Sequence, residues 1–236
     1  MSHPNLDWPR AIEIVRPFTV RVTTPEVSGT GFFLADASRG DLCGVATAAH
    51  VVNQAFLWEQ PIRIEHPVSG ETRLLRGTER AILVDQTKDT AAIVFRKEGF
   101  PFPATQLQLF GLDSPLPLGH RIGWLGFPGV AKGQMCFFSG HISSWLTDKD
   151  SYLVDGVAIN GVSGGPTFYL APDEPEPRII GCLSAYLPNR VTGEALPGLA
   201  IVTGVAEFRE VVAAFDSFDE AKGKEPPAPD FASRAK

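Results

Sequence analysis

Short apolar segments separated by turns run through most of this chain of 236 residues. The chain contains 23 glycines and 20 prolines, while charged residues make up only 20% of it. Because glycine and proline end strands and shape tight turns, this composition favours many short strands over long helices. Hydrophobic residues make up 44% of the chain, which is enough for a sizeable core. The pattern predicts an all-β protein.

The predicted strands fall into two sets, separated by the proline-rich segment Gly99–Pro117. Two six-stranded antiparallel β-barrels would use these segments well, because closed barrels remove exposed sheet edges. The first set is Phe18–Val22, Gly29–Leu34, Gly44–Thr47, Pro61–Glu65, Arg73–Leu75, Ala81–Asp85 and Ala91–Phe95. The second set is His120–Gly126, Gln134–Ser144, Tyr152–Asp155, Pro166–Leu170, Arg178–Tyr186 and Gly198–Val202.

Helices are expected only near the two ends of the chain. Asp7 can cap a short helix over Trp8–Arg16, and Val205–Phe215 has apolar residues at helical spacing. From Asp219 the chain turns polar and proline-rich, which predicts a disordered tail. The expected organisation is a helical extension (1–16), a first barrel (17–100), a connector (101–118), a second barrel with a C-terminal helix (119–218) and the tail (219–236).

Charge and terminal sequence narrow the choice of partners and location. The formal net charge is −6 and no Lys/Arg stripe is present, which argues against nucleic acid as a partner. Residues 1–8 show no basic and apolar signal pattern, so we expect no secretory signal and a cytoplasmic location. No apolar run is long enough to span a membrane.

The three cysteines, Cys43, Cys136 and Cys182, are an odd and widely spaced set. A secreted disulfide framework would need an even number, and no C-x-x-C zinc pattern is present. We therefore expect three reduced thiols in a reducing compartment, and no metal site.

Three polar residues stand in segments suited to nucleophilic chemistry. Ser163 lies in the glycine-rich segment 161–166, His50 ends the segment 47–50, and Asp89 begins an apolar run. A serine hydroxyl needs a base within hydrogen-bond distance and a third group that orients this base. Histidine can take and return a proton near neutral pH, and a carboxylate can fix its tautomer. The chain order His, Asp, Ser is one of the known orders of a catalytic triad.

Each of the three residues also has a structural interpretation: a buried histidine, a turn aspartate and a serine in a tight glycine turn. Their joint occurrence in this order favours the triad. Small residues beside the serine allow backbone N–H groups to converge, so those of Gly161 and Ser163 are the candidate donors to an oxyanion. The remaining histidines, which lack comparable surroundings, are His3, His66, His120 and His141.

These segments resemble the trypsin-like (chymotrypsin-fold) serine peptidases, and especially the bacterial HtrA/DegP-like branch. Residues 47–52 are similar to that family's Thr-Ala-x-His-Val, residues 89–93 to its Asp-Leu-Ala-Val-Leu, and residues 155–166 to its Asp-x-x-Ile-Asn-x-Gly-Asn-Ser-Gly-Gly-Pro. The likeness covers roughly residues 10–216. It implies a double β-barrel, proteolysis through an acyl-enzyme, and no cofactor.

The resemblance also implies where substrate binds. Val157 would lie near the base of the primary specificity pocket, although a core role for it is an equal alternative. Ser184, Ala185 and Tyr186 would form the strand that pairs with the substrate backbone. An apolar Val157 argues against a Lys/Arg preference, and Tyr186 would narrow the pocket in favour of small or medium apolar side chains.

The chain departs from the family pattern in three places. Val162 replaces the Asp or Asn that precedes the serine, one residue is missing between Asn160 and Gly161, and no PDZ-like segment follows residue 216. Activation by a new N-terminal amine is therefore not expected, and the support of the oxyanion loop is left open.

Our hypothesis from the sequence is a serine endopeptidase that acts on protein or peptide substrates under the control of a partner or ligand. One alternative is a binding module that retains the peptidase fold without turnover. The other is an esterase or acyl hydrolase that uses the same three residues.

Overall fold

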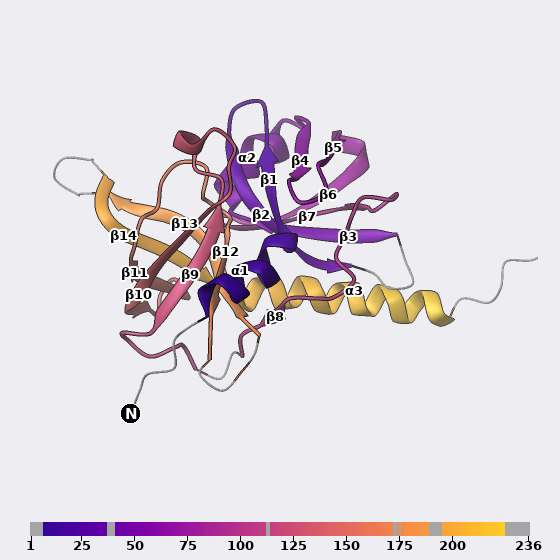
Figure 1. The fold of residues 1–236 in the computed structure, drawn as a ribbon. Coiled ribbons are helices and arrows are strands. Elements are labelled where there is room, and N and C mark those ends of the chain that lie inside the picture. The colour runs from indigo at the N-terminus through magenta and orange to yellow at the C-terminus, as the bar shows by residue number, and fades with distance from the viewer. Residues whose placement is uncertain are drawn as a thin grey trace, which may run out of the picture.

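The computed structural model describes residues 7–36, 41–111, 114–171, 174, 176–188 and 195–224. Two β-sheets form the two halves of the molecule, which lie side by side in Figure 1. This arrangement confirms the predicted all-β class and double-barrel architecture. Each sheet contains seven strands in the described part of the chain, one more than in the predicted six-stranded barrels.

The first sheet has the strand order β5-β4-β1-β2-β3-β7-β6, and all its pairings are antiparallel. No pairing between described residues joins β5 to β6, so both are edge strands. All seven predicted segments enter this one sheet. They are β1 (Thr19–Thr23), β2 (Ser28–Asp36), β3 (Leu42–Thr47), β4 (Ile62–His66), β5 (Glu71–Leu75), β6 (Arg80–Asp85) and β7 (Thr90–Arg96).

The second sheet has the order β12-β9-β10-β11-β14-β13-β8, and a further pairing of β12 with β13 closes six of its strands into a ring. The extra strand β8 comes from the connector and pairs in parallel with β13. The connector has no proline between residues 104 and 114, so its backbone N–H groups are available for this pairing. The strands are β8 (Gln108–Leu109), β9 (Arg121–Gly126), β10 (Cys136–Leu146), β11 (Ser151–Asp155), β12 (Pro166–Tyr169), β13 (Arg178–Pro188) and β14 (Ala195–Gly204).

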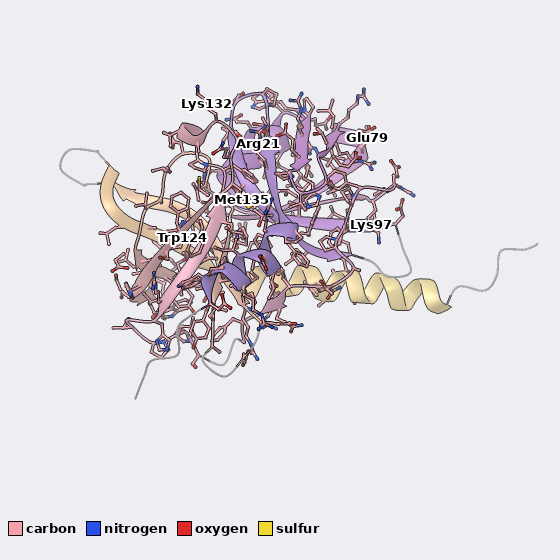
Figure 2. The ribbon with its side chains drawn as sticks, in the orientation of Figure 1. Arg21, Glu79, Lys97, Trp124, Lys132 and Met135 are labelled. Carbon is pink, nitrogen blue, oxygen red and sulfur yellow. The ribbon has the colours of Figure 1, made fainter. Side chains whose placement is uncertain are left out.

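The first helix, α1 (Trp8–Val15), begins where the sequence predicts, because the Asp7 carboxylate accepts a hydrogen bond from Arg10 N at 3.1 Å. Although α1 precedes the first sheet in sequence, it packs on the second. The ring of Trp8 lies 5.3 Å from Phe137 and 5.9 Å from Phe168, measured between centroids. Trp124 on β9, labelled in Figure 2, is fully buried in the same half.

The last helix, α3 (Ala206–Lys224), follows the second sheet in sequence but packs on β2 and β7 of the first sheet (Figure 1). Its Phe208 ring lies edge-on to Phe32 at 5.8 Å. The sequence placed the start of a disordered tail at residue 219, whereas the helix continues to Lys224, since Glu, Ala and Lys in this stretch are good helix formers. Residues 225–236 lie outside the described part.

A third helix, α2 (Ala49–Leu57), was not predicted. Its valines have a low helix propensity, and Ala48 at its N-cap position provides no side-chain hydrogen bond. Val51, Val52 and Ala55 are buried and hold the helix against the first half. The N-terminus of α2 receives its hydrogen-bond partners from a distant turn, which is part of the candidate site.

Candidate active site

The turn between β6 and β7 places Asp89 in an uncommon backbone conformation. The Asp85 carboxylate accepts hydrogen bonds from the backbone N–H groups of Thr87 at 2.8 Å and Lys88 at 3.1 Å, which tightens the turn. Asp89 then has a φ of 55°. Aspartate tolerates this left-handed region better than most residues, and such conformations concentrate at functional sites.

Asp89 is joined to His50 by three hydrogen-bond contacts. His50 Nδ1 lies 2.8 Å from Asp89 Oδ2 and 3.1 Å from Oδ1, and the His50 backbone N–H donates to Oδ1 at 2.9 Å. The Ala49 N–H donates to the Asp89 backbone carbonyl at 3.1 Å. Asp89 therefore caps the N-terminus of α2 while it contacts the imidazole. The first turn of the helix lacks internal acceptors for these N–H groups, and its dipole favours a negative charge there.

Ser184 on β13 donates its hydroxyl to Asp89 Oδ2 at 2.5 Å. Burial opposes ionisation of the Asp89 carboxyl, but the hydrogen bond and charge of His50, the Ser184 hydroxyl and the His50 N–H together hold its pKa below the ordinary value. Asp89 is therefore ionised at neutral pH and can stabilise an imidazolium. The sequence assigned Ser184 to substrate binding, and its contact with Asp89 was not predicted.

The loop that contains Ser163 is held by backbone contacts. Gly164 N donates to Leu183 O at 2.6 Å, and Leu183 N donates to Gly165 O at 3.0 Å, which fixes the loop beside β13. Gly164 has a φ of 85°, and a Cβ added there would lie 2.1 Å from Thr30 O and 2.8 Å from Ala48 N. The loop thus packs against the residues that lead into α2, in a space that admits only glycine.

The two predicted oxyanion donors are available. Asn160 O accepts from Gly129 N at 2.9 Å, and Val162 O accepts from Gly165 N at 3.0 Å. In a trans peptide the C=O and the following N–H point in opposite directions, so the N–H groups of Gly161 and Ser163 point away from these partners. Within the described residues, neither N–H donates to another group.

Thr30 on β2 joins this loop to the first half. Its hydroxyl donates to Gly161 O at 2.7 Å and accepts from Phe127 N at 3.0 Å, while its backbone N–H donates to Ser163 O at 2.8 Å. One residue thus fixes both sides of the nucleophile loop. The sequence placed Thr30 only within the predicted strand Gly29–Leu34, and its hydroxyl between two glycines is the signal that could have identified this role.

Val162 supports the Ser163 loop from the position where the family pattern has Asp or Asn. Its side chain is fully buried in the core of the second half, and a Cβ added at Gly126 would lie 2.5 Å from it. An apolar contact therefore replaces a polar one. Burial of Val162 therefore holds this side of the loop against the core of the second half.

The structure brings some predicted residues together and leaves others untested. The Ser163 hydroxyl makes no hydrogen bond with any described residue, so its contact with His50 is still a prediction. Val157 is 47% exposed beyond the end of β11, which argues against a core role. Ala185 and Tyr186 pair through their backbones with Ile201 and Ala200 of β14, and their side chains lie outside the described part.

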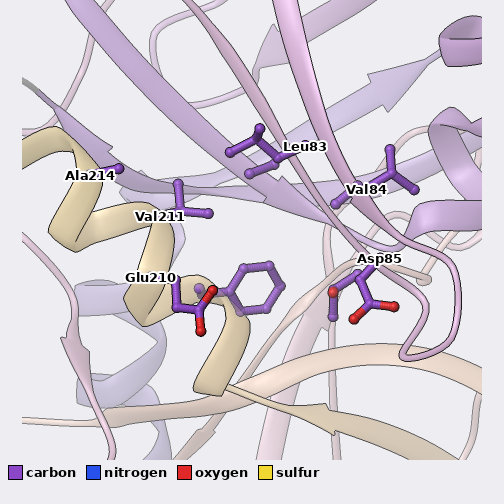
Figure 3. A pocket seen from close by; sticks show the side chains of 10 residues that line it. Leu83, Val84, Asp85, Glu210, Val211 and Ala214 are labelled. Atoms are coloured by element: carbon purple, nitrogen blue, oxygen red, sulfur yellow. The ribbon is translucent and has the colours of Figure 1, made fainter.

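A cavity of about 340 Å³ lies between α3 and the strands β6 and β7 (Figure 3). Val211 and Glu210 of α3 line one side of it, and Leu83 and Asp85 of β6 line the other. Thr90, the residue after Asp89, also lines this cavity. The cavity therefore lies behind the Asp89 turn, and neither the imidazole nor the nucleophile loop lines it.

Two further buried titratable groups, Cys182 and His66, have pKa values that their surroundings explain. Burial, reinforced by the charge of Asp89, raises the pKa of the Cys182 thiol, which makes it a poor nucleophile. His66 is buried, with Nε2 2.9 Å from Pro17 O, and burial lowers its pKa. In the described part of the chain, no group of three or more His, Cys, Asp or Glu side chains could hold a metal ion. No helix there is long and apolar enough to cross a membrane.

The fold and site define a double-barrel protein with a histidine–carboxylate pair and a glycine-rich serine loop at the junction of its halves. Residues 29–171 match the family model of the trypsin-like peptidase domain. The chain belongs to this family, a class of serine endopeptidases, as the sequence resemblance indicated. No curated protein sequence matches it.

Solved structures of other serine proteases share the fold. A mutant of Rv3671c from M. tuberculosis H37Rv, in an inactive form, aligns with a TM-score of 0.59 and 16% identity over 88% of this chain and 90% of that one. The serine endoprotease from Yersinia pestis aligns with a TM-score of 0.64 and 16% identity over 89% of this chain and 66% of that one. Deg5 aligns with a TM-score of 0.62 and 16% identity over 86% of this chain and 90% of that one.

Proposed function

We propose that the chain hydrolyses peptide bonds through an acyl-enzyme formed on Ser163, with His50 as the base and Asp89 as the orienting carboxylate. The hydrogen-bonded pair of His50 and Asp89 carries this proposal. The ionised Asp89 carboxylate supports it, because this carboxylate accepts a hydrogen bond from His50 Nδ1–H. His50 Nε2 is then free of a proton and can accept one from the Ser163 hydroxyl. The Ser163 loop packs against Ala48, two residues before the imidazole.

In the proposed reaction, His50 takes the Ser163 proton as the hydroxyl oxygen attacks the peptide carbonyl. The N–H groups of Gly161 and Ser163 stabilise the oxyanion that develops, and each such donor is worth on the order of 10²–10³ in rate. The imidazolium, stabilised by Asp89, then gives its proton to the leaving amine. Water attacks the acyl-enzyme by the same route in the second half of the reaction.

The proposed substrate-binding surface is the edge of β13 beyond Cys182. β12 pairs with β13 only as far as Cys182, so the edge from Ser184 to Pro188 has no paired strand among the described residues. An extended peptide could add to this edge through backbone hydrogen bonds at Ala185 and Tyr186. The exposed, apolar Val157 argues against a Lys/Arg preference, and Tyr186 would narrow the primary pocket in favour of small or medium apolar side chains.

A fluorophosphonate probe tests the nucleophile directly. We expect it to label the wild type and not Ser163→Ala, while Ser217→Ala, an exposed serine on α3, labels normally. Wild-type protein that resists labelling would overturn the proposed chemistry. Cleavage of casein then separates a peptidase from a binding module, and relative rates on a matched amide and ester separate it from an esterase.

We also propose that a protein partner or ligand regulates the enzyme, and that it acts in the cytoplasm. The three cysteines are reduced, which fits a reducing compartment. An unrestrained protease there would damage other proteins. Because Val162 and Thr30 already hold the nucleophile loop, regulation would act on substrate access. Casein cleavage that is equally fast with and without candidate partners would count against this part of the proposal.

A further inference from the structure

Three consecutive large apolar side chains are exposed at the C-terminal end of α2. Phe56 is 45% exposed, Leu57 56% and Trp58 71%. Single exposed apolar residues are common on protein surfaces, but a contiguous group of large ones marks an interaction site more often. We call these three residues the α2 ridge.

Leu57, the middle residue of the α2 ridge, lies on the same helix face as His50. Leu57 follows His50 by seven positions on the same helix, so the two lie about 20° apart around the axis and about 10 Å apart along it. Val51 and Val52 face the protein interior, which leaves His50 and Leu57 on the opposite, exposed side. Polar Asn53 lies between them and accepts a hydrogen bond from Gln86 at 3.0 Å.

The ridge has a rigid support. Arg80 on β6 donates through Nη2 to Ala55 O at 3.1 Å and to Gln60 O at 2.5 Å, and Trp58 N donates to Gln54 O at 2.9 Å. These bonds satisfy carbonyl groups at the helix C-terminus and tie it to the first sheet. A binding surface held in this way loses little conformational entropy when it is occupied.

We propose that the α2 ridge is a docking site for an apolar side chain of the substrate polypeptide, about three residues from the scissile bond. An extended chain advances about 3.3–3.6 Å per residue, so three residues cover the distance from the imidazole to Leu57. The occupant is the substrate because Leu57, at the centre of the ridge, lies on the helix face that presents His50. This inference rests on the proposed peptidase function, and it adds a second contact that favours long, unfolded substrates with spaced apolar residues.

The experiment compares Leu57→Gln and Trp58→Ser with the wild type on casein and on a short chromogenic peptide. Glutamine preserves helix propensity, so Leu57→Gln removes the apolar contact without breaking α2. We expect kcat/KM for casein to fall about tenfold, mainly through KM, with fluorophosphonate labelling and short-peptide turnover changed less than twofold. Leu118→Ser, which alters an equally exposed leucine before β9, is the matched control and leaves casein cleavage unchanged.

Mass spectrometry of the casein fragments gives a second measurement. Wild-type cleavage sites should be enriched in Leu, Ile, Val or Phe three residues from the scissile bond, and Leu57→Gln should lose this enrichment. If the wild type is labelled but Leu57→Gln keeps the same positional preference, docking is overturned while the peptidase function stands. If labelling and both substrates decline together, Leu57 acts through His50 and docking is also overturned. A wild type that neither labels nor cleaves overturns both proposals.

Discussion

The two halves of the molecule contribute to the site by different means. The first half provides His50 and Asp89, whose side chains bond each other directly at the N-terminus of α2. The second half provides Ser163 on a loop that is shaped by glycines and held through backbone groups. The first contribution depends on the chemistry of side chains, whereas the second depends on the absence of side chains.

The difference extends to the way the halves are joined. Among the described residues the first sheet has two unpaired edge strands, β5 and β6, whereas six strands of the second form a closed ring. Each half is covered by the terminal helix of the other, since α1 packs on the second sheet and α3 on the first. Substitution of Asp89 in the first half should therefore affect mainly catalysis, and substitution of Gly164 in the loop of the second half should affect mainly stability.

Asp89→Asn should have the largest effect. The amide would favour the wrong tautomer of His50, and kcat should fall by about 10⁴. Active-site titration combined with steady-state kinetics would measure this loss. A decrease of less than tenfold would show that Asp89 only caps α2.

The same substitution predicts a pH dependence of stability. In the folded state the pKa of Asp89 lies below its ordinary value. The ionised carboxylate therefore stabilises the fold fully at pH values above the ordinary pKa, and this stabilisation is lost as pH falls through the folded-state pKa. The difference in free energy of unfolding between wild type and Asp89→Asn should be largest at neutral pH and shrink below about pH 4. Urea unfolding across this range would measure it, and a difference independent of pH would contradict the prediction.

Gly164→Ala should be the most destabilising change in the second half. The added Cβ would meet Thr30 O and Thr47 Oγ1 at 2.1 and 2.3 Å, and we expect a loss of about 3 kcal/mol in the free energy of unfolding. Gly198→Ala is the control, because Gly198 also has a positive φ but no atom within 4 Å, and it should lose only about 1 kcal/mol. Equal losses would mean that backbone conformation, and not space, requires glycine.

Thr30→Val tests the junction between the halves. Valine has nearly the same shape but leaves Gly161 O and Phe127 N without the hydroxyl, which should cost about 2 kcal/mol. Thr23→Val, on the same sheet at a half-buried position, should change stability by less than about 0.5 kcal/mol. Thermal unfolding of the two variants would compare them, and similar melting temperatures would rule out this role for Thr30.

Among these substitutions, Ser184→Ala should have the smallest effect, and the effect should be on kcat. It removes one of the hydrogen bonds to the Asp89 carboxylate, and kcat should fall about tenfold, which corresponds to the loss of one bond to a charged group. Ser184→Thr, which keeps the hydroxyl, should recover part of this loss. A change in KM alone would instead support the role in substrate binding that the sequence suggested.

Much of the fold could be predicted from the sequence, because alternating apolar segments and their turns are local signals. The strands of both halves and the capped helix α1 were found in this way. Helix α2 was not, because Asp89, a residue far along the chain, caps its N-terminus. Strand β8 was missed for a similar reason, since two residues become a strand only when β13 lies beside them.

The sequence by itself determined the chemistry that this protein can perform: a hydroxyl, an imidazole and a carboxylate in segments typical of trypsin-like peptidases, with glycines beside the serine. Only the tertiary structure decided that Asp89 caps α2, that Ser184 contacts this carboxylate, that Thr30 joins the two halves, and that Val162 supports the loop from the core. These contacts link residues distant in sequence, so their partners depend on how the two sheets meet. Residue type and spacing can be read along the chain, but proximity is a property of the folded state alone.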